Sequence, residues 1–305
     1  HTSSVGVCVN NNFERRLGLW PAGVDKDGIL FCNQYFSDYP KSIPQGKFDP
    51  ISIKPKYMLV SYKKKVTASS EQTECKADNI VDESVKTVWQ SKTNKRGEWL
   101  AIDLGKVYDV SAIQVNFGDY KTPKKKAPRK EYGGTISQER YIEEELVEYG
   151  YVLDYSPDGE IWLSYGDGAI TTTLPHKLVE SNVKARYIRI KFISAPYNQN
   201  FTISGLRVFG FGQGDKPAQV TGERAERLSD TTANIYWNSQ PYTTGYCIRI
   251  GIAPDKLYNS ILLYGQNGYK ITFLNKETEM YYYAVDSFNE QGITEGKIQI
   301  FSRKR

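Results

Sequence analysis

Apolar and polar positions alternate along the chain in short runs, and the spacing typical of helices is scarce. The runs are rich in Val, Ile, Tyr, Phe and Thr and are interrupted by Gly, Pro, Asn and Asp. This is the pattern of β-strands joined by turns. Clear examples are EWLAIDLGKVYDVSAIQVNF, YGYVLDYSPDGEIWLSYGD and KARYIRIKFISAPYNQNFTISGLRVFG. The sequence therefore predicts an all-β protein, and its 305 residues are enough for two or three domains.

Turn signals and changes in composition divide the chain into segments. Residues 1–46 hold the strand-like runs SVGVCV and GILFCN, and Asp25–Gly28 predicts a hairpin turn because Asp and Gly accept the positive φ of tight turns. The proline-rich residues 47–56 predict a linker. A middle domain follows over residues 57–212, and residues 217–305 show strand runs at the spacing of a small β-sandwich.

Charge and cysteine usage argue against several classes of function. The formal net charge is only +5, and the basic run Lys121–Lys130 lies near the acidic run Glu143–Glu148. A nucleic-acid partner is therefore not expected. The four cysteines and two histidines form no motif typical of a zinc site, a disulfide framework or a nucleophilic triad.

The remaining sequence features concern location and one acidic segment. No run of residues is long and apolar enough to span a membrane, and no signal peptide is visible. The chain begins without methionine inside a strand-like run, so we expect a processed or truncated product. Residues Ser137–Gly150 contain good helix formers without a clean apolar stripe, which favours an insertion loop over a helix.

The middle of the chain resembles the discoidin, or coagulation factor 5/8 type C, family, whose carbohydrate-binding members form family 32. The pieces that carry the resemblance over residues 64–210 are VTASSEQ, IVDESVKTVWQS, EWLAIDLG, YSPDGEIW, ARYIRI and ISGLRVFG, in the order of the family. The resemblance implies a β-sandwich of the jelly-roll type. It also implies that Trp89, Trp99 and Trp162 pack in the core of this sandwich.

The same resemblance implies a structural calcium in the loop from Ala77 to Trp89, with Asp82 and Thr87 as ligands. Calcium prefers six to eight oxygen ligands in flexible geometry, which such a loop can supply. The sequence departs from the family in two places, because Glu83 replaces a glycine and Gly205 replaces a glutamate. Two interpretations stay open: a weakened calcium site, or a loop in which Asp82 and Thr87 form hydrogen bonds without metal.

Binding of a sugar requires an exposed aromatic ring and fixed polar groups for the hydroxyls. Two loops of the middle domain offer these groups, Gly118–Gly134 and Ser194–Phe201. The candidate carbohydrate-binding residues are Tyr120, Arg129, Tyr132, Tyr197, Asn198 and Asn200. The alternative is that these side chains pack against a neighbouring domain.

The flanking segments carry two further resemblances. Residues 217–305 are similar to fibronectin type III, with Trp237 as the core tryptophan. The stretch NFERRLGLWPAGVDKDGILFCNQYFSDYP resembles the end of the last blade of the five-bladed propeller in family 43 glycoside hydrolases. Two strands cannot complete a propeller blade, so we expect residues 1–45 either to pack on the middle domain or to dock into an upstream propeller.

Together these resemblances predict a discoidin-like sandwich followed by a fibronectin type III sandwich and preceded by the remnant of a propeller blade. The implied function is the non-catalytic, glycan-binding part of a polysaccharide-degrading enzyme of arabinosidase or xylosidase type, outside the cytoplasm of a bacterium. Its implied partners are a glycan and an upstream propeller that carries the three catalytic carboxylates. The alternative is an adhesion module for a protein or membrane surface, which the polar loops SSEQTECKADN and QSKTNKRG disfavour.

Overall fold

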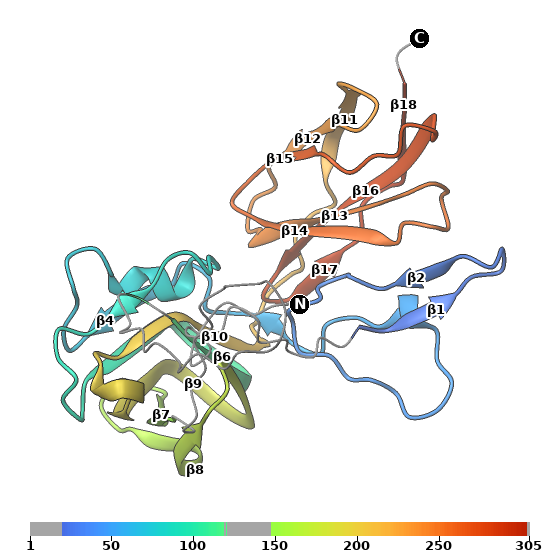
Figure 1. Cartoon of the computed structure of the whole chain (residues 1–305). Helices are drawn as coiled ribbons and strands as arrows, with labels where there is room; N and C mark the ends of the chain where they lie inside the picture. The colour runs from blue at the N-terminus through green and yellow to red at the C-terminus, as the bar shows by residue number, and fades with distance from the viewer. Residues whose placement is uncertain (1–19, 119, 121–147, 304–305) are drawn as a thin grey trace, which may run out of the picture. The chain divides into compact units, whose positions relative to one another are not determined.

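The computed structural model describes residues 20–118, 120 and 148–303. The described residues form β-strands and three short 3-10 helices, which confirms the all-β prediction. No helix in these ranges is long and apolar enough to cross a membrane. The chain divides into two compact units (Figure 1). We call the part from residue 60 to 210 the middle unit and the part formed by residues 20–59 and 211–303 the outer unit.

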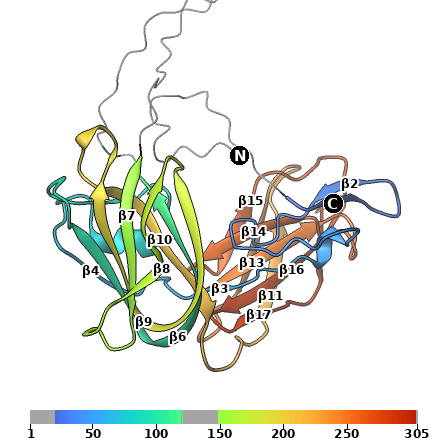
Figure 2. The ribbon, with the colours of Figure 1, turned by 90° about the horizontal axis from the view of Figure 1, so that it is seen from below.

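The middle unit contains one continuous set of paired strands. Strand β6 pairs antiparallel with β9, β9 with β7, and β7 with β8, while β10 lies on the other side of β6. Strand β4 also pairs with β6, and β5 pairs with β10. The strands are β4 (Lys65–Ala68), β5 (Trp89–Gln90), β6 (Trp99–Phe117), β7 (Tyr149–Ser156), β8 (Leu163–Thr172), β9 (His176–Ser194) and β10 (Thr202–Phe211), with helices η2 (Ala77–Val81) and η3 (Pro196–Asn198) between them. The long strands β6 and β9 run beside each other for much of their length (Figure 2).

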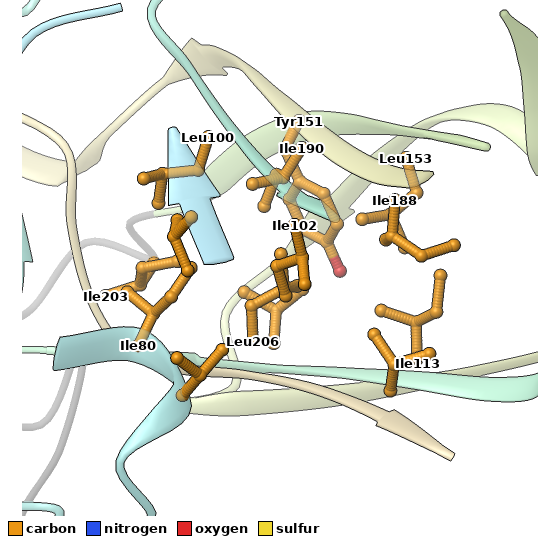
Figure 3. Packing of buried hydrophobic residues seen from close by; sticks show 14 of the residues in the cluster. Ile80, Leu100, Ile102, Ile113, Tyr151, Leu153, Ile188, Ile190, Ile203 and Leu206 are labelled. Carbon is orange, nitrogen blue, oxygen red and sulfur yellow. The ribbon is translucent and has the colours of Figure 1, made fainter. Parts of the chain in front are cut away.

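The core of the middle unit follows from the alternation of side chains along these strands. Leu100 and Ile102 of β6 meet Ile188 and Ile190 of β9 in a cluster of fully buried side chains (Figure 3). Trp89 is also fully buried in this cluster, which confirms its predicted core position. Burial of each such side chain contributes about 1.5–3 kcal/mol to folding, so this face of the sheet stabilises the unit.

The other face of the same strands is the outer face of the sheet. Two of the tryptophans that were predicted to lie in the core are found on this face instead. Trp99 alternates with Leu100 and lies on this face, where it is half-buried. Trp162, at the end of the turn between β7 and β8, is half-buried as well. Neither ring belongs to the buried cluster of the unit. The family resemblance predicted burial for both because it gave the position of each tryptophan along the chain but not its exposure.

The outer unit contains a sandwich of two sheets. One sheet has the order β11-β12-β15, and the other has the order β14-β13-β16-β17 with β18 also paired to β16. Trp237 is 3% exposed in the core between them, as predicted. The strands are β11 (Thr221–Arg227), β12 (Ala233–Asn238), β13 (Gly245–Gly251), β14 (Asn259–Tyr264), β15 (Gly268–Ile271), β16 (Met280–Asn289), β17 (Gly292–Thr294) and β18 (Gln299–Ser302).

Residues 20–59 contain the predicted hairpin and belong to the outer unit. Strands β1 (Ala22–Val24) and β2 (Leu30–Cys32) are antiparallel, and the 3-10 helix η1 (Pro50–Ser52) and the short β3 (Met58–Leu59) follow. In the turn, Asp25 Oδ1 accepts hydrogen bonds from the backbone N–H groups of Asp27 and Ile29, both at 2.9 Å. Gly28 has the positive φ that was expected there, +79°.

The packing of this segment differs from the expectation that residues 1–45 lie on the middle unit or in a separate propeller. The described part, from residue 20, packs on the C-terminal sandwich: the Phe31 ring stacks on Tyr258 at 4.3 Å, and Phe36 meets Phe288 edge to face. The Tyr35 hydroxyl donates a 2.8 Å hydrogen bond to buried Asp286. Strands β1 and β2 alone offer little apolar surface, so this non-local packing supplies the burial that stabilises the segment.

The proline-rich residues 47–56 are also part of the outer unit rather than an isolated linker. Ile53 is 5% exposed. Lys54 forms a 2.8 Å ion pair with Glu295, and its ammonium group lies over the Tyr35 ring. Pro50–Ser52 forms the 3-10 helix η1, and among residues 47–56 only Ile53 is buried.

Candidate functional site

The predicted sugar-binding residues from two distant segments meet at one end of the middle unit, which we call the loop end. It is formed by residue 120, residues 90–97 and residues 195–201. Arg129 and Tyr132 lie outside the residues that the structure describes. Tyr120, Tyr197, Asn198 and Asn200 can therefore be placed, and the following contacts show what holds them.

The backbone of residues 196–200 turns sharply through helix η3. Tyr197 and Asn198 have positive φ angles of 59° and 52°, a region that Asn tolerates better than most residues. Asn94 Nδ2 donates to both the backbone oxygen and Oδ1 of Asn198, at 2.8 and 2.9 Å. Asn200 Nδ2 donates to the backbone oxygen of Lys92 at 3.2 Å. These bonds fix the 195–201 loop against the 90–97 loop.

Tyr120 is joined to the same network through Gln90. Gln90 Nε2 donates to the backbone oxygen of Tyr120 at 3.2 Å and to Thr202 Oγ1 at 2.9 Å. Thr202 Oγ1 donates to the backbone oxygen of Asn200. The hydroxyl of Tyr120 donates to Glu74 at 2.5 Å. Gln90, Lys92 and Asn94 of the 90–97 loop thus each form a hydrogen bond with one of the predicted residues Tyr120, Asn200 and Asn198.

The buried carboxylate of Glu98 forms hydrogen bonds with residues of two loops. Glu98 is 9% exposed and accepts hydrogen bonds from the hydroxyls of Ser69, Ser70 and Thr93. Burial would raise the pKa of Glu98, but these hydrogen bonds, with that of Ser69 the strongest, outweigh it and lower the pKa below its usual range. Glu98 is therefore ionised at neutral pH and keeps the loop end in one conformation.

The loop that the family resemblance assigns to calcium is closed by its own hydrogen bonds. Asp82 Oδ1 accepts from the backbone N–H of Ser84 at 2.8 Å. Thr87 Oγ1 donates to Asp82 Oδ2 at 2.7 Å, so both carboxylate oxygens already have a donor. This arrangement is the metal-free alternative that the sequence left open.

Next to Asp82, a buried ion pair further reduces the fit to calcium. The guanidinium of Arg207 binds Glu83 through Nε at 3.2 Å and Nη2 at 2.9 Å, and both side chains are less than 8% exposed. No group of three His, Cys, Asp or Glu side chains within the described ranges is arranged to hold a metal ion. The buried guanidinium beside Asp82 and the missing carboxylate at Gly205 both disfavour calcium in this loop, and calcium binding stays a prediction.

The outer face of the sheet carries a concave feature, which we call the sheet pocket. Its volume is about 360 Å³, and its lining includes Trp99, Trp162 and Tyr187. Thr67 and Ala101, which pair across β4 and β6, form the floor. Large half-buried rings around a floor of small side chains create the hollow.

Ion pairs fix the wall of the sheet pocket. Arg189 Nε and Nη2 donate to Asp154 Oδ2 at 3.0 and 2.8 Å, and the guanidinium lies 3.8 Å from the centre of the Trp162 ring. Lys191 also pairs with Asp154, at 2.9 Å. These contacts hold the Trp162 indole in one orientation.

Sequence reasoning missed the sheet pocket although the signal was present. In EWLAIDLG, the apolar Leu100 and Ile102 alternate with Trp99 and Ala101, and strand geometry places the two sets on opposite faces. With one face assigned to the core, Trp99 is directed outward. The prediction followed the family resemblance, which places this tryptophan in the core, rather than the alternation along the strand.

Comparison with known proteins identifies part of the middle unit. Residues 65–130, which are 66 of the 305 residues, match the F5/8 type C domain. A comparison with curated proteins gave no match.

Similar solved structures cover about half of the chain. Chitosan-binding module 1 of a chitosanase/glucanase from Paenibacillus sp. IK-5 is 18% identical and covers 50% of this chain and 99% of its own, with a TM-score of 0.37. The family 32 module of AlyQ, in complex with 4,5-unsaturated mannuronic acid, is 20% identical over 50% and 98%, with a TM-score of 0.35. A family 89 glycoside hydrolase from Clostridium perfringens is 20% identical over 53% of this chain and 16% of its own, also with a TM-score of 0.35. The F5/8 type C match thus lies within the middle unit, in the part of the sequence where the resemblance was noted.

Proposed function

We propose that the middle unit is a glycan-binding module and that the loop end is its binding site. The observation that carries the proposal is that the 90–97 loop forms hydrogen bonds with Tyr120, Asn198 and Asn200. Tyrosine and amide side chains on loops that are fixed by hydrogen bonds are the groups that can orient a sugar. The F5/8 type C match to residues 65–130 supports a module of this class.

The proposal extends to the parent protein. We infer that the chain is the accessory part of an extracytoplasmic, polysaccharide-degrading glycoside hydrolase of family 43 type. Support comes from the resemblance of residues 12–40 to a propeller end and of residues 217–305 to a fibronectin type III spacer. The two-sheet sandwich of the outer unit is compatible with such a spacer. The catalytic propeller would then be the partner of this chain.

Binding at the loop end should be weak, with a Kd of roughly tens of micromolar to millimolar, because a shallow site buries few contacts against the cost of ordering the ligand. Calorimetry with plant and host oligosaccharides measures it. Tyr120→Ala and Asn198→Gly should each reduce affinity, and glycine at 198 preserves the positive φ.

Tyr242→Ala is the matched control, because Tyr242 is 91% exposed in the outer unit. It should bind as the unmodified chain does. A glycan that binds equally well to Tyr120→Ala, Asn198→Gly and the double variant Tyr132→Ala with Tyr197→Ala would contradict the assignment of the loop end.

A further inference from the structure

The sheet pocket contains aromatic side chains that are only partly buried. Trp99 is half-buried on the outer face of β6, and among the described residues no ring or cation is stacked on its indole. Alternate positions on the outer face of a sheet are usually polar. A ligand that stacks on an indole at such a position removes the open face of the ring from water, and this burial favours binding.

The walls of the sheet pocket are held in place before any ligand binds. Trp162 Nε1 donates to the backbone oxygen of Gly159 at 3.2 Å. Gly159 has a φ of +89°, and a Cβ built on it would lie 3.2 Å from the Tyr187 ring. The turn between β7 and β8 therefore packs closely on Tyr187. A preformed pocket spares a ligand part of the ordering cost of binding.

Charges of both signs lie around the sheet pocket. Arg189 and Lys191 share one carboxylate, Asp154, and Arg186 binds Asp103 through two hydrogen bonds of 2.8 and 2.9 Å. The lining also contains Asp158 and Glu160, and Glu160 is exposed.

Asp158 contributes a fixed negative charge to this lining. Its Oδ1 accepts from the backbone N–H groups of Glu160 and Ile161, at 2.9 and 3.1 Å. These bonds, with that of Glu160 the strongest, lower the pKa of Asp158, which is therefore ionised at neutral pH. Two carboxylates beside aromatic rings suit a ligand that offers hydroxyl or ammonium donors along the edge of an apolar ring face.

We propose that the sheet pocket is a second saccharide site, which binds a pyranose ring of a neutral or amino sugar by stacking on Trp99 with its donors on Asp158 and Glu160. The pocket volume of about 360 Å³ is at the lower end of ligand sites, which fits one sugar ring better than a larger ligand. Uronic acids are disfavoured, since their carboxylate would face Asp158 and Glu160. The argument uses no residue of the loop end, so the two sites can be tested separately.

The experiment titrates the full chain with neutral, amino and uronic oligosaccharides, using saturation-transfer NMR and calorimetry. Trp99→Ala should reduce affinity for the preferred sugar by about tenfold or more. Glu160→Lys should shift the preference toward uronic oligosaccharides; Glu160 is exposed, so this variant tests the site even if Trp99→Ala impairs folding. Tyr242→Ala is again the control and should leave affinity unchanged.

The outcomes separate the two proposals. Loss of binding in Trp99→Ala and Glu160→Lys, but not in Asn198→Gly, supports the sheet pocket and removes the loop end as the site. Loss in Asn198→Gly alone, with Trp99→Ala and Glu160→Lys unchanged, overturns the sheet pocket and leaves the loop end in place. Partial loss in both sets supports two sites. The absence of binding to every oligosaccharide overturns both.

Discussion

Replacing Glu83 by glycine has two opposing effects on the stability of the middle unit. Glu83 has a φ of +61°, a conformation that costs a residue with a side chain about 1–2 kcal/mol and that glycine adopts freely. Relief of this strain favours the variant. The same change removes the partner of Arg207, whose side chain is 6% exposed. Removal of one partner from a buried ion pair costs about 3–5 kcal/mol.

The second effect is larger, so Glu83→Gly should destabilise the middle unit by roughly 1–4 kcal/mol. Arg207→Met should destabilise it as well, because Glu83 is then buried without its cation. The double variant Glu83→Gly with Arg207→Met should recover most of the loss, since no uncompensated charge stays buried and the backbone strain is gone. Urea unfolding of the four proteins, followed by tryptophan fluorescence, measures these differences. A Glu83→Gly protein as stable as the unmodified chain, or more stable, would refute the reasoning.

The unmodified chain and Asp82→Ala test the calcium site, because a ligand that binds only the folded state raises the stability of that state by mass action. At one hundred times its Kd, calcium would add about 2.7 kcal/mol, which shifts the melting temperature of a domain of this size by several degrees. We expect the melting temperature in calcium chloride to equal that in a chelator. A clear rise with calcium that Asp82→Ala abolishes would show that the loop binds the metal despite its internal hydrogen bonds.

Three further predictions follow from other parts of the structure. Burial would raise the pKa of Asp25, but hydrogen bonds from Ile29 and Tyr258 outweigh it and lower this pKa. The contribution of ionised Asp25 to the stability of the fold is therefore complete above the unfolded pKa of about 3.9 and is lost as the pH falls. The stability difference between the unmodified chain and Asp25→Asn, measured by unfolding at a series of pH values, should therefore narrow below about pH 4; a constant difference would contradict this. Gly159→Ala should destabilise by about 1–2 kcal/mol from its φ of +89°, with an added cost from Tyr187. The control Gly168→Ala has a φ of +99° and open space around it, so equal losses in the two variants would show that Tyr187 adds nothing. Finally, chromogenic assays should detect no hydrolysis of aryl arabinosides or xylosides by this chain, but hydrolysis of at least one by the chain joined to its upstream propeller, and turnover by the purified chain would contradict the accessory role.

Local signals predicted the parts of the fold that depend on neighbouring residues. The turn at Asp25–Gly28 forms because its backbone conformation and side-chain hydrogen bonds are set within five positions of the chain. Strand alternation likewise predicted that the segments of β6 and β9 are strands. What alternation could not predict was the partner of residues 20–59, since Phe31 and Phe36 pack with Tyr258 and Phe288, more than 200 positions away. The order of elements along a chain does not show which of two units such a segment will join.

The buried pair beside Asp82 illustrates the same limit within the candidate site. The sequence showed two departures from the family, Glu83 and Gly205, and each was weighed as the loss of a calcium feature. In the structure the departure at Glu83 is paired with Arg207, two positions beyond Gly205 on β10 and 124 positions from Glu83. The carboxylate of Glu83 and the guanidinium of Arg207 can be buried only as a pair, because either charge alone would be buried at a cost of several kcal/mol. Residues that compensate each other across a sheet can therefore be recognised only once the fold is known.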